Sequence, residues 1–85
     1  MKNSLVKEIN LILGNYDLER LVDGVAEYEY MTEAQLIFDF MSNAKYITTK
    51  NLAEAIQSIF NERFGTVHSL QDCMYVSDDI LWSIQ

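Results

Sequence analysis

The sequence predicts an all-α protein, a compact single-domain bundle of four or five short helices that takes in residues 1–85. Proline is absent and glycine occurs three times, so few residues interrupt a helix. Hydrophobic residues make up 49% of the chain, and they recur at a spacing of three or four positions. Residue types that start and stop helices separate these apolar segments, which is the pattern of a small helical domain.

Two helices are expected before residue 31. Apolar residues at helical spacing predict the first over about residues 4–13, with Gly14 and Asn15 as its C-terminal stop. Asp17 is a good N-cap for the second helix. One face of that helix would carry Leu18, Leu21, Val22 and Val25. Because residues 25–30 alternate apolar and acidic side chains, they would also suit a short strand.

A third helix is expected from Thr32 to about Ser42. Thr32 and Gln35 have the spacing of a capping box, in which each side chain bonds a free backbone N–H at the helix start. The apolar arc of this helix is wide, and it consists of Leu36, Ile37, Phe38, Phe40 and Met41. Such an arc indicates either a central helix with neighbours on two sides or a surface buried by a second copy of the protein.

Two more helices are expected in the C-terminal half. The first should start at Thr48 or Thr49, with a second capping box over residues 51–54, and should end at Gly65. Ser69 is the expected N-cap of the last helix. Residues 77–79 could restart a separate short turn within it.

The charge of the chain is strongly negative, with 13 acidic against 6 basic residues and a net charge of −7. A field of this sign repels phosphate backbones and anionic lipids, so we expect no direct binding of nucleic acid or of membranes. It favours instead a protein partner with a basic surface. The alternative is that the acidity only keeps a small protein in solution.

The cysteine content and the hydropathy pattern indicate a cytoplasmic protein. Cys73 is the only cysteine, which excludes an internal disulfide and a cysteine-rich zinc site. The N-terminus lacks the features of a signal peptide, and charged residues interrupt the apolar stretches before they could span a membrane.

An acidic segment over residues 18–33 is the candidate binding surface. On a helix, Glu19, Asp23 and Glu27 would line one face, where like charges cost about 0.2 to 0.5 kcal/mol per pair. Tyrosines at one end would add contact area, since tyrosine is frequent among binding hot spots. The expected partner-binding residues are Glu19, Asp23, Glu27, Tyr28, Glu29, Tyr30 and Glu33. The alternative is a solvated face that opposes the apolar one.

Catalytic chemistry is not indicated. His68 and Cys73 would point in different directions on one helix, because five residues separate them. We expect Cys73 to be buried and His68 to be structural or exposed. The three glycines are isolated, so the sequence contains no phosphate-binding loop, and nothing in it indicates a metal site or a cofactor. The expectation is therefore a protein that is not an enzyme.

In size, acidity and lack of catalytic motifs, the chain is similar to the small inhibitors and adaptors that bacteriophages and mobile elements encode. This similarity implies a protein-binding module that covers a basic or hydrophobic surface of its partner. Self-association as a homodimer would use Phe38, Met41 and Trp82.

Two alternative functions involve nucleic acids. The acids of residues 19–33 could occupy a phosphate-binding site of a partner and so mimic a nucleic acid. Residues 47–60, ITTKNLAEAIQSIF, loosely resemble the opening helix of a helix-turn-helix. The residues that follow this segment are not rich in the basic and amide side chains of a recognition helix, and the net charge opposes DNA binding.

Overall fold

The computed structural model describes residues 2–21 and 29–84, and within these ranges it contains four helices and no strand. The helices are α1 (Lys2–Tyr16), α2 (Met31–Asn43), α3 (Thr49–Phe64) and α4 (Leu70–Ser83). The prediction of an all-α bundle is therefore confirmed. The radius of gyration is 11.7 Å, close to the value of about 12 Å expected for a folded chain of this length.

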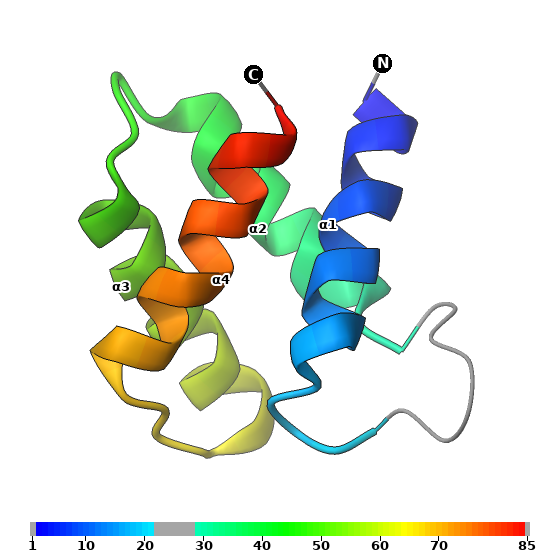
Figure 1. Ribbon diagram of the computed structural model, residues 1–85, viewed down its shortest axis with the longest axis vertical. Helices are drawn as coiled ribbons and strands as arrows, with labels where there is room; N and C mark the ends of the chain where they lie inside the picture. The colour runs from blue at the N-terminus through cyan, green and yellow to red at the C-terminus, as the bar shows by residue number, and fades with distance from the viewer. Residues whose placement is uncertain (1, 22–28, 85) are drawn as a thin grey trace.

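The four helices pack as a closed ring in which each helix contacts two others. Helix α2 lies between α1 and α3, and α4 lies between α3 and α1, so that the two ends of the described chain come to the same end of the bundle (Figure 1). The contact between α1 and α4 is the least extensive of the four. Neighbours on two sides account for the wide apolar arc of α2, as the first of the two sequence-based interpretations expected.

One continuous apolar core fills the centre of the ring, and all four helices contribute to it. Its fully buried side chains are Ile9 and Leu13 from α1, Ala34 and Ile37 from α2, Leu52, Ala53, Ile56 and Phe60 from α3, and Cys73, Val76 and Ile80 from α4. The prediction that Cys73 is buried is confirmed. Burial raises the pKa of its thiol to about 11, so Cys73 is uncharged and inaccessible at neutral pH.

The helix boundaries before residue 31 differ from the sequence-based expectation. Helix α1 continues through Gly14 and Asn15 and ends at Tyr16. Asp17 follows with φ of 51°, a left-handed conformation that aspartate tolerates better than most residues, and it ends α1 instead of starting a helix. Residues 17–19 form a turn, so a second helix starting at Asp17 was wrong. Residues 22–28, where the rest of that helix or the alternative strand was expected, lie outside the described residues.

The predicted capping box at the start of α2 was also wrong. The N-cap is Tyr30, which makes no side-chain capping bond, and Thr32 lies within the first turn. The backbone N–H of Tyr30 donates instead to the amide oxygen of Asn10 on α1, at 2.9 Å. Gln35, the expected partner of Thr32, donates to Asp39 one turn further along α2. The start of α2 is therefore held by the contact with Asn10 of α1, and not by the capping box that the local sequence indicated.

The C-terminal helix boundaries follow the sequence closely. Thr48 caps α3 through a reciprocal pair of bonds with Asn51, so the capping box lies at residues 48–51 and not at 51–54. Gly65 ends α3 with φ of 72°, which a residue with a side chain adopts only at a cost. Ser69 caps α4, which continues without a restart at residues 77–79 because Ser77 is buried and donates to the carbonyl of Cys73.

Loss of a side chain that caps a helix should destabilise the protein, whereas loss of the Thr32 side chain, which caps none, should not. We expect Thr48→Ala and Ser69→Ala each to lower the free energy of unfolding by about 1 kcal/mol, because each leaves a helix N–H without its partner. Thr32→Ala is the matched control and should change it by less than about 0.5 kcal/mol. Urea denaturation of the three variants measures this. A loss for Thr32→Ala as large as that for Thr48→Ala would contradict the capping assignment.

Candidate functional site

The acidic segment that the sequence singled out does not form a helical binding stripe in the described part of the chain. Glu19 lies in the turn after α1, and Glu29 and Tyr30 lie in the turn before α2. Asp23, Glu27 and Tyr28 lie outside the described residues. The remaining predicted residues differ in their surroundings: Tyr30 and Glu33 are buried, the side chain of Glu19 is 8% exposed, and Glu29 is exposed.

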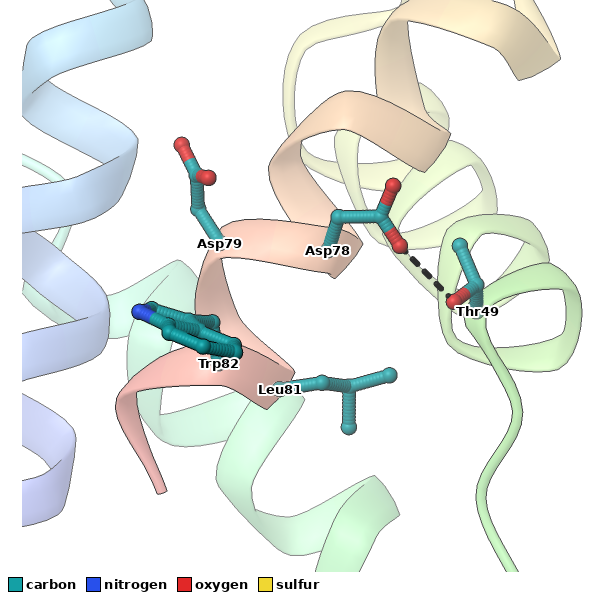
Figure 2. Close-up of a pocket in the computed structure, with 5 residues that line it drawn as sticks. All are labelled: Thr49, Asp78, Asp79, Leu81 and Trp82. Carbon is teal, nitrogen blue, oxygen red and sulfur yellow. Dashed lines mark hydrogen bonds between the residues drawn. The ribbon is translucent and has the colours of Figure 1, made fainter. Parts of the chain in front are cut away.

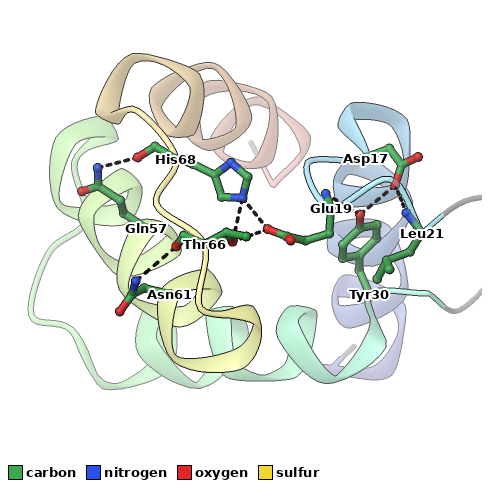
Figure 3. A network of polar contacts seen from close by, with 8 residues as sticks. All are labelled: Asp17, Glu19, Leu21, Tyr30, Gln57, Asn61, Thr66 and His68. Atoms are coloured by element: carbon green, nitrogen blue, oxygen red, sulfur yellow. Dashed lines mark hydrogen bonds and ion pairs between the residues drawn. The ribbon is translucent and has the colours of Figure 1, made fainter.

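Glu19 joins the turn after α1 to the connection between α3 and α4. Its side chain is buried, and its Oε2 accepts a hydrogen bond from Thr66 Oγ1 at 2.5 Å and pairs with His68 Nε2 (Figure 3). The ring of His68 packs edge-on against Phe60, with ring centroids 5.7 Å apart. His68 is therefore a structural residue, which is one of the two roles expected for it.

Two amide side chains of α3 hold the connection that carries Thr66 and His68. Gln57 Nε2 donates to the backbone oxygen of His68 at 2.7 Å, and Asn61 Nδ2 donates to that of Thr66 at 3.2 Å (Figure 3). These bonds fix the position at which Glu19 docks. Glu19 consequently stabilises the fold and is not available to a partner.

Tyr30 is fully buried, contrary to its predicted role as an exposed contact residue. Its hydroxyl donates to Asp17 Oδ1 at 2.7 Å and accepts from the backbone N–H of Glu19 at 3.0 Å (Figure 3). Its ring stacks on Phe60 with centroids 5.9 Å apart. Burial, and then the hydrogen bond to Asp17, raise the pKa of Tyr30 to about 12.

Glu33 is buried as well, with 3% of its side chain exposed. It accepts a hydrogen bond from Arg63 Nε of α3 at 2.9 Å, which joins the start of α2 to the end of α3. A buried carboxylate with its partner already bound cannot serve as a docking charge. Glu19, Tyr30 and Glu33 do not form the exposed surface that the sequence indicated, because residues distant in sequence cover them. No observation tests their predicted role in partner binding, which stays a prediction. Glu29 is exposed, and its predicted role stays a prediction.

The residues proposed for self-association do not form one surface. Phe38 and Met41 are half-buried on α2 and pack against the core, whereas Trp82 is exposed on α4. Helices α2 and α4 do not pack against each other.

A different surface combines acidic and aromatic side chains, and it lies on α4. Asp72, Tyr75, Asp78, Asp79 and Trp82 are all exposed, and on a helix with 100° per residue they fall within an arc of about 120°. We refer to these five residues as the α4 outer face. Trp82 is 78% exposed and Tyr75 is 54% exposed. Tryptophan and tyrosine are the aromatic residues most frequent among binding hot spots.

Two of the three carboxylates of the α4 outer face, those of Asp78 and Asp79, are held by hydroxyl groups. Asp79 Oδ2 accepts from the hydroxyl of Tyr16 on α1 at 2.6 Å, and Asp78 Oδ1 accepts from Thr49 on α3 at 2.9 Å. The bond to Asp79, and then burial, raise the pKa of Tyr16 to about 12, so this hydroxyl remains a donor at neutral pH. Among residues 4–21 and 29–84, neither carboxylate forms an ion pair with a lysine or arginine. Their charge is therefore oriented without being neutralised.

A pocket of about 400 Å³ opens on the C-terminal half of this face. Thr49, Asp78, Asp79, Leu81 and Trp82 line it. Figure 2 shows Asp79 and the Trp82 ring on the side toward α1, and Asp78 and Leu81 on the side toward α3. The pocket thus offers an indole surface and carboxylate oxygens to the same ligand.

Sequence reasoning missed this face although the signal is present. Tyr75 and Trp82 share one face of a helix with Asp72, Asp78 and Asp79, a spacing that can be read from the sequence alone. The choice between this face and residues 18–33 depends on which acids have partners, and those contacts join distant parts of the chain.

Two further classes of site find no support in the described ranges. Residues 2–21 and 29–84 contain no cluster of His, Cys, Asp or Glu suited to holding a metal ion. No helix formed by the same residues has the length and apolar character needed to cross a bilayer.

The hydroxyl of Tyr30 should contribute to stability in a pH-dependent way. We expect Tyr30→Phe to lower the free energy of unfolding at neutral pH by about 1 to 3 kcal/mol, because two hydrogen bonds with buried or half-buried partners are lost. The pKa is higher in the folded state than the ordinary 10.0, so the contribution is complete below pH 10 and is lost as the pH rises toward about 12.

Urea denaturation between pH 7 and pH 12 tests this prediction. Wild type should lose more stability above pH 10 than Tyr30→Phe does. Tyr46→Phe, at an exposed tyrosine, should match wild type throughout. Identical pH profiles of wild type and Tyr30→Phe would show that the buried phenol is not hydrogen-bonded as described.

The pair between Arg63 and Glu33 should be structural. Arg63→Gln leaves a buried carboxylate without its cation, and we expect it to lower the free energy of unfolding by about 1 to 3 kcal/mol. Arg20→Gln makes the same change at an exposed arginine and should have an effect within about 0.5 kcal/mol. Thermal or urea unfolding of both variants provides the measurement. Equal effects would argue against a structural role of Glu33.

Comparison with protein-family models, with curated protein sequences and with solved structures gives no match for this chain.

Proposed function

We propose that this protein is a small, acidic, non-catalytic module that binds a basic surface of a partner protein through the α4 outer face. The observation that carries the proposal is the combination of three carboxylates, to which residues 4–21 and 29–84 supply no cationic partner, and two exposed aromatic rings on that one face. Acidic charge accelerates the encounter with a basic partner, and aromatic anchors slow its dissociation. Binding would cover the partner's surface, as an inhibitor or adaptor of the bacteriophage type does.

The contrast with the other described acids supports this choice of surface. Glu19 and Glu33 have partners within the fold and stabilise it. The three acids of α4 form no ion pair with the described lysine and arginine side chains, and α4 itself contains neither lysine nor arginine. Like charges on one surface repel one another, and a basic partner would relieve that repulsion.

The same charge distribution argues against a helix-turn-helix. If α3 were its first helix, α4 would take the place of the recognition helix, because it follows after a short connection. Three exposed carboxylates on α4 would then face the phosphates of DNA. We further propose that the protein acts in the cytoplasm. Its single cysteine, Cys73, is buried, uncharged and not in a disulfide, which suits a reducing compartment.

The proposal predicts that basic peptides bind and that neutralising α4 prevents their binding. Selection from a random peptide library on the immobilised protein should enrich arginine and lysine above their frequency in the library. The triple variant Asp72→Asn, Asp78→Asn, Asp79→Asn should bind a selected peptide at least tenfold more weakly, a difference of about 1.4 kcal/mol or more. Higher salt should weaken binding to the wild type because the attraction is electrostatic.

A matched control removes the same charge elsewhere. Glu8, Glu54 and Glu62 are exposed, so the triple variant Glu8→Gln, Glu54→Gln, Glu62→Gln changes the net charge equally and leaves α4 intact. It should bind within about twofold of wild type. Both triple variants should keep wild-type thermal stability, since neither removes a buried partner. Peptides without basic enrichment, or equal losses in the two variants, would refute the proposal.

A further inference from the structure

The pocket on α4 places a broad aromatic surface directly beside two carboxylates. Asp79 and Asp78 precede Trp82 by three and four residues, which brings their Cβ atoms to within about 6 Å of that of Trp82 on a helix. The Trp82 ring lies on the same side of α4 as Asp79, toward α1, and Asp78 lines the pocket on the side toward α3 (Figure 2). Most of the Trp82 side chain is exposed, and a ligand in the pocket can lie against it.

Each of the two carboxylates retains acceptor capacity. The hydroxyls of Tyr16 and Thr49 bond Asp79 Oδ2 and Asp78 Oδ1, and no hydrogen bond from the described residues reaches the second oxygen of either carboxylate. A carboxylate has about four acceptor positions, so one hydroxyl leaves most of them open. The two hydroxyl bonds also restrict rotation of the carboxylates, which lowers the entropy lost when a ligand binds.

The chemistry of this pocket selects among ligand classes. An anion would be repelled by Asp78 and Asp79. A purely apolar ligand would displace water from the carboxylates and supply no hydrogen bond in return, which is costly. A cation with N–H donors and a flat face satisfies both parts of the pocket at once.

We propose that the pocket binds the guanidinium group of an arginine side chain in the partner, stacked on Trp82 and donating to Asp79 and Asp78. The proposal rests on the proposed function, because it assumes a basic partner at the α4 outer face. Guanidinium is planar, stacks on aromatic rings and presents several donors in a fixed fork. A lysine ammonium matches the charge but offers neither the flat face nor the fork, so the pocket discriminates between the two basic side chains.

Trp82 is the only tryptophan in the sequence, so its fluorescence reports directly on the pocket. The probes are three acetylated and amidated alanine pentapeptides whose central residue is arginine, lysine or norleucine, titrated at low ionic strength. We expect a saturable change of Trp82 emission with the arginine peptide and binding about threefold tighter than with the lysine peptide, because guanidinium adds a flat stacking face and a fork of donors that an ammonium lacks. The norleucine peptide should give no saturable change.

Variants then locate the site. Asp78→Asn with Asp79→Asn should abolish saturation by the arginine peptide, although an asparagine can still accept the bonds from Tyr16 and Thr49. Glu54→Gln with Glu62→Gln is the matched double variant and should titrate like wild type. Trp82→Leu, followed by amide NMR shifts, should bind the arginine and lysine peptides equally weakly, because the stacking surface that favours arginine is gone.

The outcomes separate this inference from the proposed function. Equal affinity of the wild type for arginine and lysine peptides would overturn the arginine pocket, while library peptides that still need the α4 acids would leave the proposed function intact. Library peptides that bind without changing the fluorescence of Trp82 would likewise overturn the arginine pocket and leave the proposed function intact. Absence of any basic ligand, in the titrations and in the selection, would overturn both.

Discussion

The burial of Tyr30 is the constraint on which the rest of the fold depends. A phenol can be buried without loss only when its hydroxyl has hydrogen-bond partners, and here Asp17 and the backbone of Glu19 supply them. The ring stacks on Phe60 of α3, and the backbone N–H of Tyr30 bonds Asn10 of α1. One residue thus fixes the end of α1, the start of α2 and their contact with α3. With these three elements in place, Glu19 reaches His68, and α4 closes the ring between α3 and α1.

The acidic residues divide into two groups that differ in what neutralises them. Asp17, Glu19 and Glu33 accept hydrogen bonds from residues that are distant in sequence, and they connect elements that would otherwise touch only through apolar side chains. Among the described residues, Asp78 and Asp79 accept bonds from hydroxyl groups and form no ion pair, so they are oriented but keep their charge. Exposed charge of this kind, next to exposed aromatic rings, makes α4 the candidate binding surface.

The architecture explains why α4 presents such a surface. Its apolar stripe is covered by α3 on one side and α1 on the other, which uses the inner arc of the helix and leaves the opposite arc in water. Tyr16 and Thr49 sit on these two flanking helices, and each contributes one hydroxyl to the rim of the outer face. The same two helices, α1 and α3, therefore pack against α4 and orient its carboxylates. Because those carboxylates are held in place before a ligand arrives, binding loses less conformational entropy than it would with mobile side chains.

The sequence by itself determined the all-α class and the features set by neighbouring residues. The ends of α3 and the start of α4 are among these features: they lie at Thr48, Gly65 and Ser69. Capping involves atoms within a few residues of one another, so the local sequence is enough to predict it. Burial of Cys73 followed from its place on an apolar stripe. Only the tertiary structure decided which acids are free, since Glu33 meets its partner 30 residues away and Glu19 meets His68 49 residues away. Contacts of that separation leave no periodic or local pattern. They placed Tyr30 in the core, displaced the capping box expected at Thr32, and moved the candidate site from residues 18–33 to α4.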